Sequence, residues 1–209
     1  MAIVVVGGHS RSVGKTSVVA GLIQRLPEME WTAIKITQYG HGICSSHGEP
    51  CECAVDDEEH TWAITEERSH SSATDTARFL AAGATRSLWV RTRQGRLAEA
   101  LPRLRTEIEK DGNFIIESNS IMGFLWPDLY LTVLDFGTAD FKDSARLFLD
   151  RADAILMHSE SVNLPPNWSG VSLKLTEHKP VFGLRHGDYV TNELVEYVRN
   201  RLSLDRARV

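Results

Sequence analysis

Short apolar runs and amphipathic segments alternate along the chain. Apolar runs rich in β-branched residues predict strands that are buried on both faces of a sheet. They lie at Ala2–Val6, Trp31–Thr37, Ser87–Arg91, Phe114–Ile116, Tyr130–Leu134, Ala154–Met157 and Val181–Leu184. Apolar residues at helical spacing predict helices between these runs. The helices are expected from Val18 to Leu26 before Pro27, over Asp75–Ala82 with Gly83 as its cap, along Leu97–Ile108, around Ser144–Leu149 and along Val190–Leu202.

This alternation predicts an α/β fold, in which helices cover both faces of a mostly parallel sheet. Such sheets bind ligands at the carboxyl ends of their strands, so the residues after Val6, Thr37 and Ile116 are the first candidates for a site. The 209 residues show neither an internal repeat nor a linker, and we expect a single domain over residues 1–209.

The periodicity disappears from about residue 38 to residue 72. This stretch is rich in Gly, Ser, His, Cys and acidic residues. It is too long for an ordinary loop, so we expect a Cys/His-rich insertion that is either functional or disordered.

Composition narrows the class of partner. The hydrophobic fraction of 42% is ordinary for a globular protein, and the net charge is −5 without a long Lys/Arg tract. This balance argues against a nucleic-acid or membrane-surface partner. No run approaches the roughly 20 apolar residues of a membrane span, and the first residues lack a signal peptide's pattern, so the cytoplasm is the expected location.

The segment "GGHSRSVGKTS" stands between the first predicted strand and the first predicted helix. Glycines there let backbone amides point inward, and the helix N-terminus adds positive potential, which together suit phosphate groups. Lys15 is positioned to reach the outer phosphates and the Thr16 hydroxyl to bind Mg²⁺. Five residues separate Gly8 from Gly14 where the usual loop has four, and His9 stands at the usual glycine position. The predicted phosphate-binding residues are Gly8, His9, Ser10, Arg11, Ser12, Val13, Gly14, Lys15, Thr16 and Ser17.

Two charged residues lie at or near the ends of predicted strands. Lys35 either projects over the phosphates and offsets charge during phosphoryl transfer, or reaches water at a strand end. Glu117 ends "NFIIE", where an acid can hold Mg²⁺ directly or through water, and we favour that role over a solvent-facing cap. Asp56 and Asp57 are lesser candidates, because acidic runs are more often solvated surface.

All three cysteines lie in "HGICSSHGEPCEC". Cys44, Cys51, Cys53 and His47 would complete a tetrahedral site for Zn²⁺ or another thiophilic metal. Their spacing is not that of a zinc finger, and the alternative is three reduced thiols in a loop. The apolar run at 121–127 has two interpretations as well: packing against the core, or the surface of a homodimer or a substrate lid.

Three segments resemble the molybdopterin-guanine dinucleotide biosynthesis B-type proteins, which are small P-loop GTP-binding proteins. They are the opening loop, "IKITQYGHG" at Ile34–Gly42, and "DTARFLAAGA" at Asp75–Ala84. The resemblance implies a P-loop NTPase fold, slow GTP hydrolysis with Mg²⁺ and Lys15, and a partner in molybdenum-cofactor biosynthesis or maturation. The longer loop and "KITQYG" are similar instead to dethiobiotin synthetase, in which Lys35 would activate a carboxylate or carbamate with ATP.

A third hypothesis is a nucleotide-dependent metallochaperone, because "CEC" resembles the Cys-x-Cys of nickel-inserting maturation ATPases. The guanine-recognition sequence Asn-Lys-x-Asp is absent from the chain, so GTP over ATP rests on the resemblance alone. We rank the molybdenum-cofactor accessory protein first, the metallochaperone second and the synthetase third.

Overall fold

In a computed structural model that describes residues 1–39, 61–71, 73–110, 112–160, 168 and 170–206, eight strands form one sheet with the order β3-β4-β2-β5-β1-β6-β7-β8. The strands are β1 Ala2–Gly8, β2 Trp31–Tyr39, β3 Trp62–Glu66, β4 Arg86–Arg93, β5 Asn113–Glu117, β6 Leu129–Leu134, β7 Ala154–His158 and β8 Val181–Leu184. The α-helices are α1 Lys15–Arg25, α2 Asp75–Ala81, α3 Leu97–Ile108, α4 Asp143–Phe148 and α5 Asn192–Arg206.

The expected α/β architecture is confirmed, because every strand pair except β3–β4 is parallel. Strand β3 was not among the predicted strands, and it lies in the stretch from about residue 38 to residue 72 where the periodicity disappears. It pairs antiparallel with β4 at the sheet edge, with Ile64 opposite Val90. An edge strand of five residues, with no residue fully buried, carries too short an alternation to be recognised.

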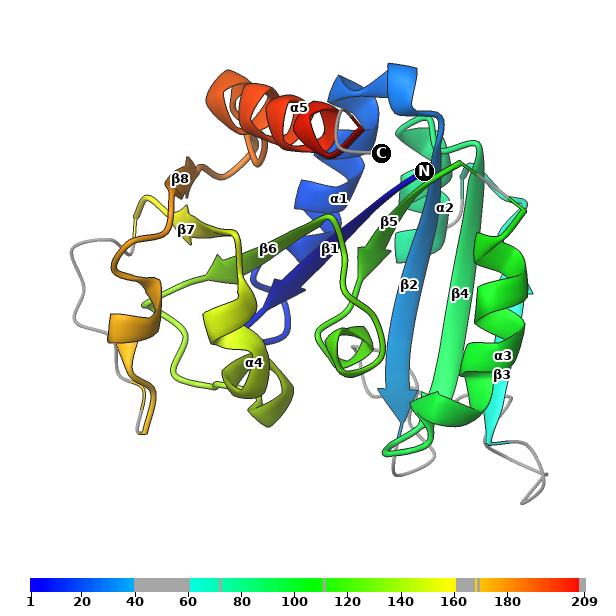
Figure 1. Ribbon diagram of the computed structural model, residues 1–209, viewed down its shortest axis with the longest axis horizontal. Helices are drawn as coiled ribbons and strands as arrows, with labels where there is room; N and C mark the ends of the chain where they lie inside the picture. The colour runs from blue at the N-terminus through cyan, green and yellow to red at the C-terminus, as the bar shows by residue number, and fades with distance from the viewer. Residues whose placement is uncertain (40–60, 72, 111, 161–167, 169, 207–209) are drawn as a thin grey trace.

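Two hydrophobic cores lie on the two faces of the sheet. Helices α1, α2 and α5 contribute to one, around Leu22, Phe79 and Leu194. Helices α3 and α4 cover the other, around Leu104 and Phe148 (Figure 1). Both faces of the central strands are therefore buried, as their continuous apolar sequences predict. Within the described part of the chain, no helix is long and apolar enough to cross a membrane.

The register of the central strands places the site. Glu117 at the end of β5 lies opposite Val6 of β1 on one side and opposite Lys35 of β2 on the other. The loop after β1 leads directly into α1, and Thr74 caps α2 by accepting a hydrogen bond from the Ala77 amide (3.1 Å). The carboxyl ends of β1 and β5 and the middle of β2, at Lys35, thus meet the N-termini of α1 and α2.

Candidate functional site

The loop between β1 and α1 presents its amides at a helix N-terminus. Gly14 precedes α1 in a left-handed conformation (φ 90°). Within the described residues, no acceptor bonds the amides of the segment Ser10–Ser17. Free amides that begin a helix bind anions, so the loop has the geometry that its sequence predicts for phosphate groups.

His9 has a different role from the one that the motif predicts. Its ring is fully buried against Trp168 and Phe141, with centroids 4.8 and 5.2 Å away. The Asp135 amide donates to Nε2 (3.1 Å), so the proton is on Nδ1, which donates to the Asp140 carbonyl (2.8 Å). Burial lowers the pKa of His9. With its own amide bonded to the Val133 carbonyl, His9 shapes the loop from inside, and we no longer expect it to contact a ligand.

Asn119 anchors the start of the loop. Its side chain accepts from the Gly8 amide and donates to the Gly8 carbonyl, each at 2.9 Å. The Tyr130 hydroxyl donates weakly to the same amide oxygen (3.5 Å). Asn119 follows β5 by two residues, and we did not single it out from the sequence, because an Asn after a strand is an ordinary turn signal.

Lys15 begins α1 and folds back over the loop, where its ammonium donates to the Ser10 carbonyl. Burial, with smaller contributions from the charges of Lys142 and Lys35, lowers the pKa of Lys15 to about 8 against the opposing charge of Glu117. Burial and then the charge of Arg11 also lower the pKa of Lys142. This concentration of cations favours a polyanion beside the loop.

Thr16, Lys35, Glu117 and Asp75 form one cluster at the end of the loop. The Thr16 hydroxyl donates to Glu117 Oε2 (2.8 Å), and Glu117 Oε1 accepts from the Lys35 ammonium. The same ammonium lies 2.9 Å from Asp75 Oδ2 and 3.4 Å from Thr16 Oγ1. Burial lowers the pKa of Lys35, but the charges of Glu117 and Asp75 outweigh it and raise that pKa overall. Of the two interpretations of Lys35, the structure therefore favours the one in which its side chain lies at the candidate site over the one in which it reaches water at a strand end.

The cluster's oxygens suit Mg²⁺. Carboxylate and hydroxyl oxygens are the ligands that this cation prefers, and it binds them octahedrally at about 2.1 Å. Neighbouring ligands of such an octahedron are about 3 Å apart by geometry, and the 2.8 Å between Thr16 Oγ1 and Glu117 Oε2 matches that spacing. Thr16 and Glu117 are therefore the residues that fit the metal.

Asp75 and Arg78 are the site residues whose place the sequence did not predict. Both belong to α2, where Arg78 donates to the Ser17 hydroxyl (3.1 Å) and lies 3.7 Å from Asp75. A signal was present in "DTARFLAAGA", but residue spacing does not say that α2 starts beside α1.

Some of the remaining loop residues are exposed, and the others contact neighbouring segments of the protein. Arg11 and Ser12 are exposed, whereas the Ser10 hydroxyl donates to Asp140 (2.7 Å). Val13 is buried, and its carbonyl lies 3.0 Å from His158 Nε2. Tyr189, on the loop after β8, packs so closely on the helix start that a Cβ at Gly14 would lie 2.7 Å from its ring.

The predicted cysteine site falls on residues that the structure does not describe. Cys44, Cys51, Cys53, His47, Asp56 and Asp57 all lie within 40–60. Among the described residues there is no group of three His, Cys, Asp or Glu side chains that could hold a metal. The thiophilic metal site stays a prediction.

The apolar run after Glu117 is divided between core and surface. Ile121 and Met122 are buried, whereas Phe124 is 41% and Trp126 83% exposed. The Arg151 guanidinium stacks on the Trp126 ring at 3.8 Å, close to α4. The packing interpretation therefore holds for Ile121 and Met122, and the dimer surface or substrate lid stays a prediction for the exposed part of the run.

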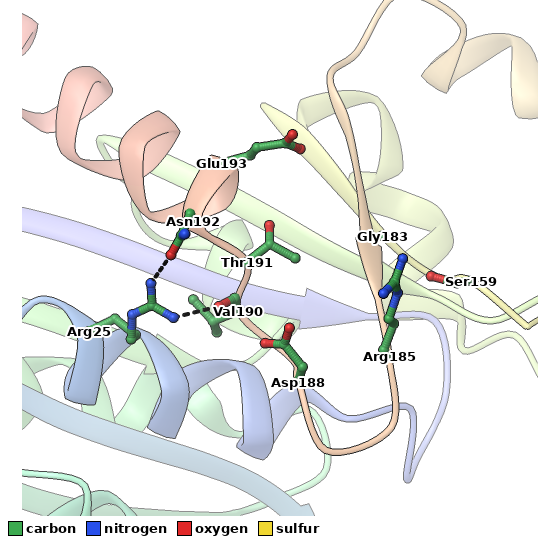
Figure 2. Close-up of a pocket in the computed structure, with 9 residues that line it drawn as sticks. All are labelled: Arg25, Ser159, Gly183, Arg185, Asp188, Val190, Thr191, Asn192 and Glu193. Atoms are coloured by element: carbon green, nitrogen blue, oxygen red, sulfur yellow. Dashed lines mark hydrogen bonds between the residues drawn. The ribbon is translucent and has the colours of Figure 1, made fainter.

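A separate pocket of about 470 Å³ lies between the ends of β7 and β8 and the start of α5 (Figure 2). Its lining carries both signs of charge, from Arg25, Arg185, Asp188 and Glu193. Arg25 is held there by the Val190 carbonyl (3.3 Å) and the Asn192 side chain. No residue of the loop Gly8–Ser17 lines this pocket, so it is distinct from the cluster above.

Comparison with known proteins finds weak similarity to solved structures. No model of a known protein family matches the chain, and no curated protein matches it significantly. Among solved structures, HypB from Helicobacter pylori in complex with nickel is 16% identical, with 98% of this chain and 86% of HypB covered and a TM-score of 0.49. The apo form of LpxK from Aquifex aeolicus in complex with ATP is 19% identical, with a TM-score of 0.48. That alignment covers 88% of this chain and only 53% of LpxK. With the strand–loop–helix unit at β1 and α1 and the parallel sheet around it, the chain has the α/β fold of the P-loop NTPase class.

Proposed function

We propose that the protein binds a magnesium–nucleoside triphosphate with its phosphates in the loop Gly8–Ser17, and hydrolyses it slowly. One observation carries the proposal. Four residues predicted from three separate segments converge beside a row of free amides: Lys15, Thr16, Lys35 and Glu117. Phosphoryl chemistry requires amides free to bind phosphate oxygens, cations to offset their charge, and an acid and a hydroxyl that fit Mg²⁺, and these groups lie together here.

Each residue then has a task in that chemistry. The amides from Ser10 to Ser17 hold the phosphate oxygens, and the Lys15 ammonium turns from the Ser10 carbonyl to the outer phosphates. Thr16 and Glu117 would hold the magnesium ion, which supplies neutralisation of phosphate charge when bound. Lys35 lies one hydrogen bond from both of these residues, where an ammonium can offset the charge that develops as the terminal phosphoryl group departs.

Within this class we favour a GTP-binding accessory protein of molybdenum-cofactor biosynthesis. Support comes from the three segments that resemble the B-type proteins, because described residues from each segment meet at one site. Lys15 comes from the first, Lys35 from the second, and Asp75 with Arg78 from the third. The nucleotide-dependent metallochaperone and the dethiobiotin synthetase-like enzyme remain alternatives.

Titration calorimetry of the protein with GTP and with ATP, each with and without Mg²⁺, tests the core of the proposal. We expect binding of a triphosphate, a loss of affinity of about tenfold or more in Lys15→Met, and a weaker Mg²⁺ dependence in Glu117→Gln. Lys174→Met removes an exposed lysine far from the loop in sequence and serves as the matched control. Absence of heat with either nucleotide would rule the function out.

Two further measurements separate the alternatives. Turnover of diaminopelargonic acid with ATP would favour the synthetase, and its absence would count heavily against it. A clear preference for GTP over ATP, with no turnover of diaminopelargonic acid, is the result expected for the molybdenum-cofactor protein.

A further inference from the structure

The Lys35 ammonium lies among the oxygens that fit the metal. Its neighbours are Glu117 Oε1, Asp75 Oδ2 at 2.9 Å and Thr16 Oγ1 at 3.4 Å. The Lys35 side chain is 15% and that of Glu117 only 3% exposed. A buried carboxylate needs a partner cation, so the ammonium in this place stabilises Glu117, whereas the more exposed Asp75 also has Arg78 3.7 Å away.

We infer that Lys35 is a tethered substitute for the metal, and that it excludes Mg²⁺ from the site until a nucleotide arrives. The inference rests on the proposed function, because it concerns the metal of the bound nucleotide. Asp75 belongs to this cage of three oxygens and helps to hold the ammonium in it.

Charge explains why the two cations exclude each other. A divalent ion bound to Thr16 and Glu117 would share their oxygens with an ammonium in hydrogen-bond contact, at a separation where like charges repel strongly. The ammonium must then leave. Lys15 and Lys142 flank it, and their positive charges oppose its movement toward them.

A bound triphosphate removes this obstacle. Its outer phosphate would lie beside Lys15 and offer Lys35 a new anionic partner, within reach of a flexible four-carbon side chain. The metal and the nucleotide therefore enter together, while free Mg²⁺ competes with an internal ammonium whose local concentration is high. Lys35 acts here as a positioning residue that sets the order of binding.

Binding of Mn²⁺ to the nucleotide-free protein, followed by electron paramagnetic resonance, tests the inference. We expect weak binding by the native chain and at least about tenfold tighter binding by Lys35→Met. Lys15→Met is the matched variant, since it removes a neighbouring positive charge but leaves Lys35 in the cage. The gain in Mn²⁺ affinity of Lys15→Met measures through-space repulsion alone. The gain in Mn²⁺ affinity of Lys35→Met must exceed it by about tenfold. Glu117→Gln in the Lys35→Met background should cancel most of the gain in Mn²⁺ affinity, because Glu117 is the carboxylate that would hold the metal.

Equal gains in the two lysine variants would overturn the inference. Because Lys35→Met leaves the buried Glu117 without its cation and can unfold, Lys35→Gln repeats the measurement with an amide that still donates hydrogen bonds. A native protein whose thermal midpoint rises with Mg²⁺ alone as much as that of Lys35→Gln would also overturn it.

Calorimetry with nucleotide on the same samples tests the proposed function separately from the role of Lys35 as a substitute for the metal. If the native protein binds nucleotide and Lys35→Met shows no gain in Mn²⁺ affinity, the substitute role fails and the proposed function stands. If no nucleotide binds but the gain is found, the cage is a metal-excluding site and the proposed function fails.

Discussion

Replacing Gly14 by alanine changes the loop where α1 begins, at the contact with Tyr189. The backbone of Gly14 has φ 90°, and an added Cβ would lie 2.7 Å from Cε1 of the Tyr189 ring. The added methyl group destabilises the folded protein in two ways. A left-handed backbone costs a non-glycine residue about 1–2 kcal/mol. The overlap, about 1 Å short of ordinary carbon contact, requires the ring to shift and costs about 1–3 kcal/mol more.

The total destabilisation expected for Gly14→Ala is therefore about 2–5 kcal/mol. Gly83 is the matched control, because it has φ 105° and no atom within 4 Å of the corresponding Cβ. Gly83→Ala should lose only the backbone part, about 1–2 kcal/mol. Urea unfolding of the nucleotide-free protein measures both values.

A double-mutant cycle isolates the contact. Tyr189→Ala in the Gly14→Ala background should recover the steric part, so we expect a coupling free energy of about 1–3 kcal/mol between the two positions. If Gly14→Ala and Gly83→Ala destabilise equally, or if the coupling is zero, then Tyr189 does not press on the start of α1 and the account of the loop's support is wrong.

Four other predictions concern the loop, the surface and the cysteines. Burial holds the pKa of Lys15 at about 8 in the folded protein, below its ordinary value of 10.5. Between these two pH values the Lys15 amine is protonated in the unfolded chain but largely neutral in the folded one, so the free energy of unfolding should rise with pH there. Phosphates favour the charged ammonium, so nucleotide affinity should fall there by up to about tenfold per pH unit, as calorimetry in buffers of different ionisation enthalpy would detect. Asn119→Ala removes both bonds to Gly8 and should cost about 2–4 kcal/mol in urea unfolding, whereas a cost below about 1 kcal/mol would contradict its anchoring role. If the expected homodimer uses the exposed Trp126, then Trp126→Ser should shift sedimentation toward the monomer; an unchanged dimer would exclude this surface. If the cysteines hold a metal, the purified protein should contain it and the Cys51→Ser/Cys53→Ser variant should lose it, and a metal-free native protein would end that hypothesis.

The architecture could be predicted because its signals are local. The buried strands of the centre, such as β1 and β6, are apolar along their whole length, and the helices carry apolar residues at regular spacing. Strand β3 was missed because it is short and lies on the sheet edge, where one antiparallel neighbour, β4, and not its own residues, holds it in place.

The chain alone determined which residue types could meet a nucleotide: a strand, a glycine-containing loop with Lys15 and Thr16, a helix, and an acid at the end of a buried strand. Only the tertiary structure decided how these groups are paired. The register of β1, β5 and β2 puts Glu117 beside Lys35, and the packing of α2 against α1 adds Asp75 to them. It also turned His9 inward, because two aromatic side chains from distant segments enclose its ring. Contacts between residues far apart along the chain leave no periodic trace in the sequence, and those contacts raise the pKa of Lys35 and bring the Thr16 and Glu117 oxygens together.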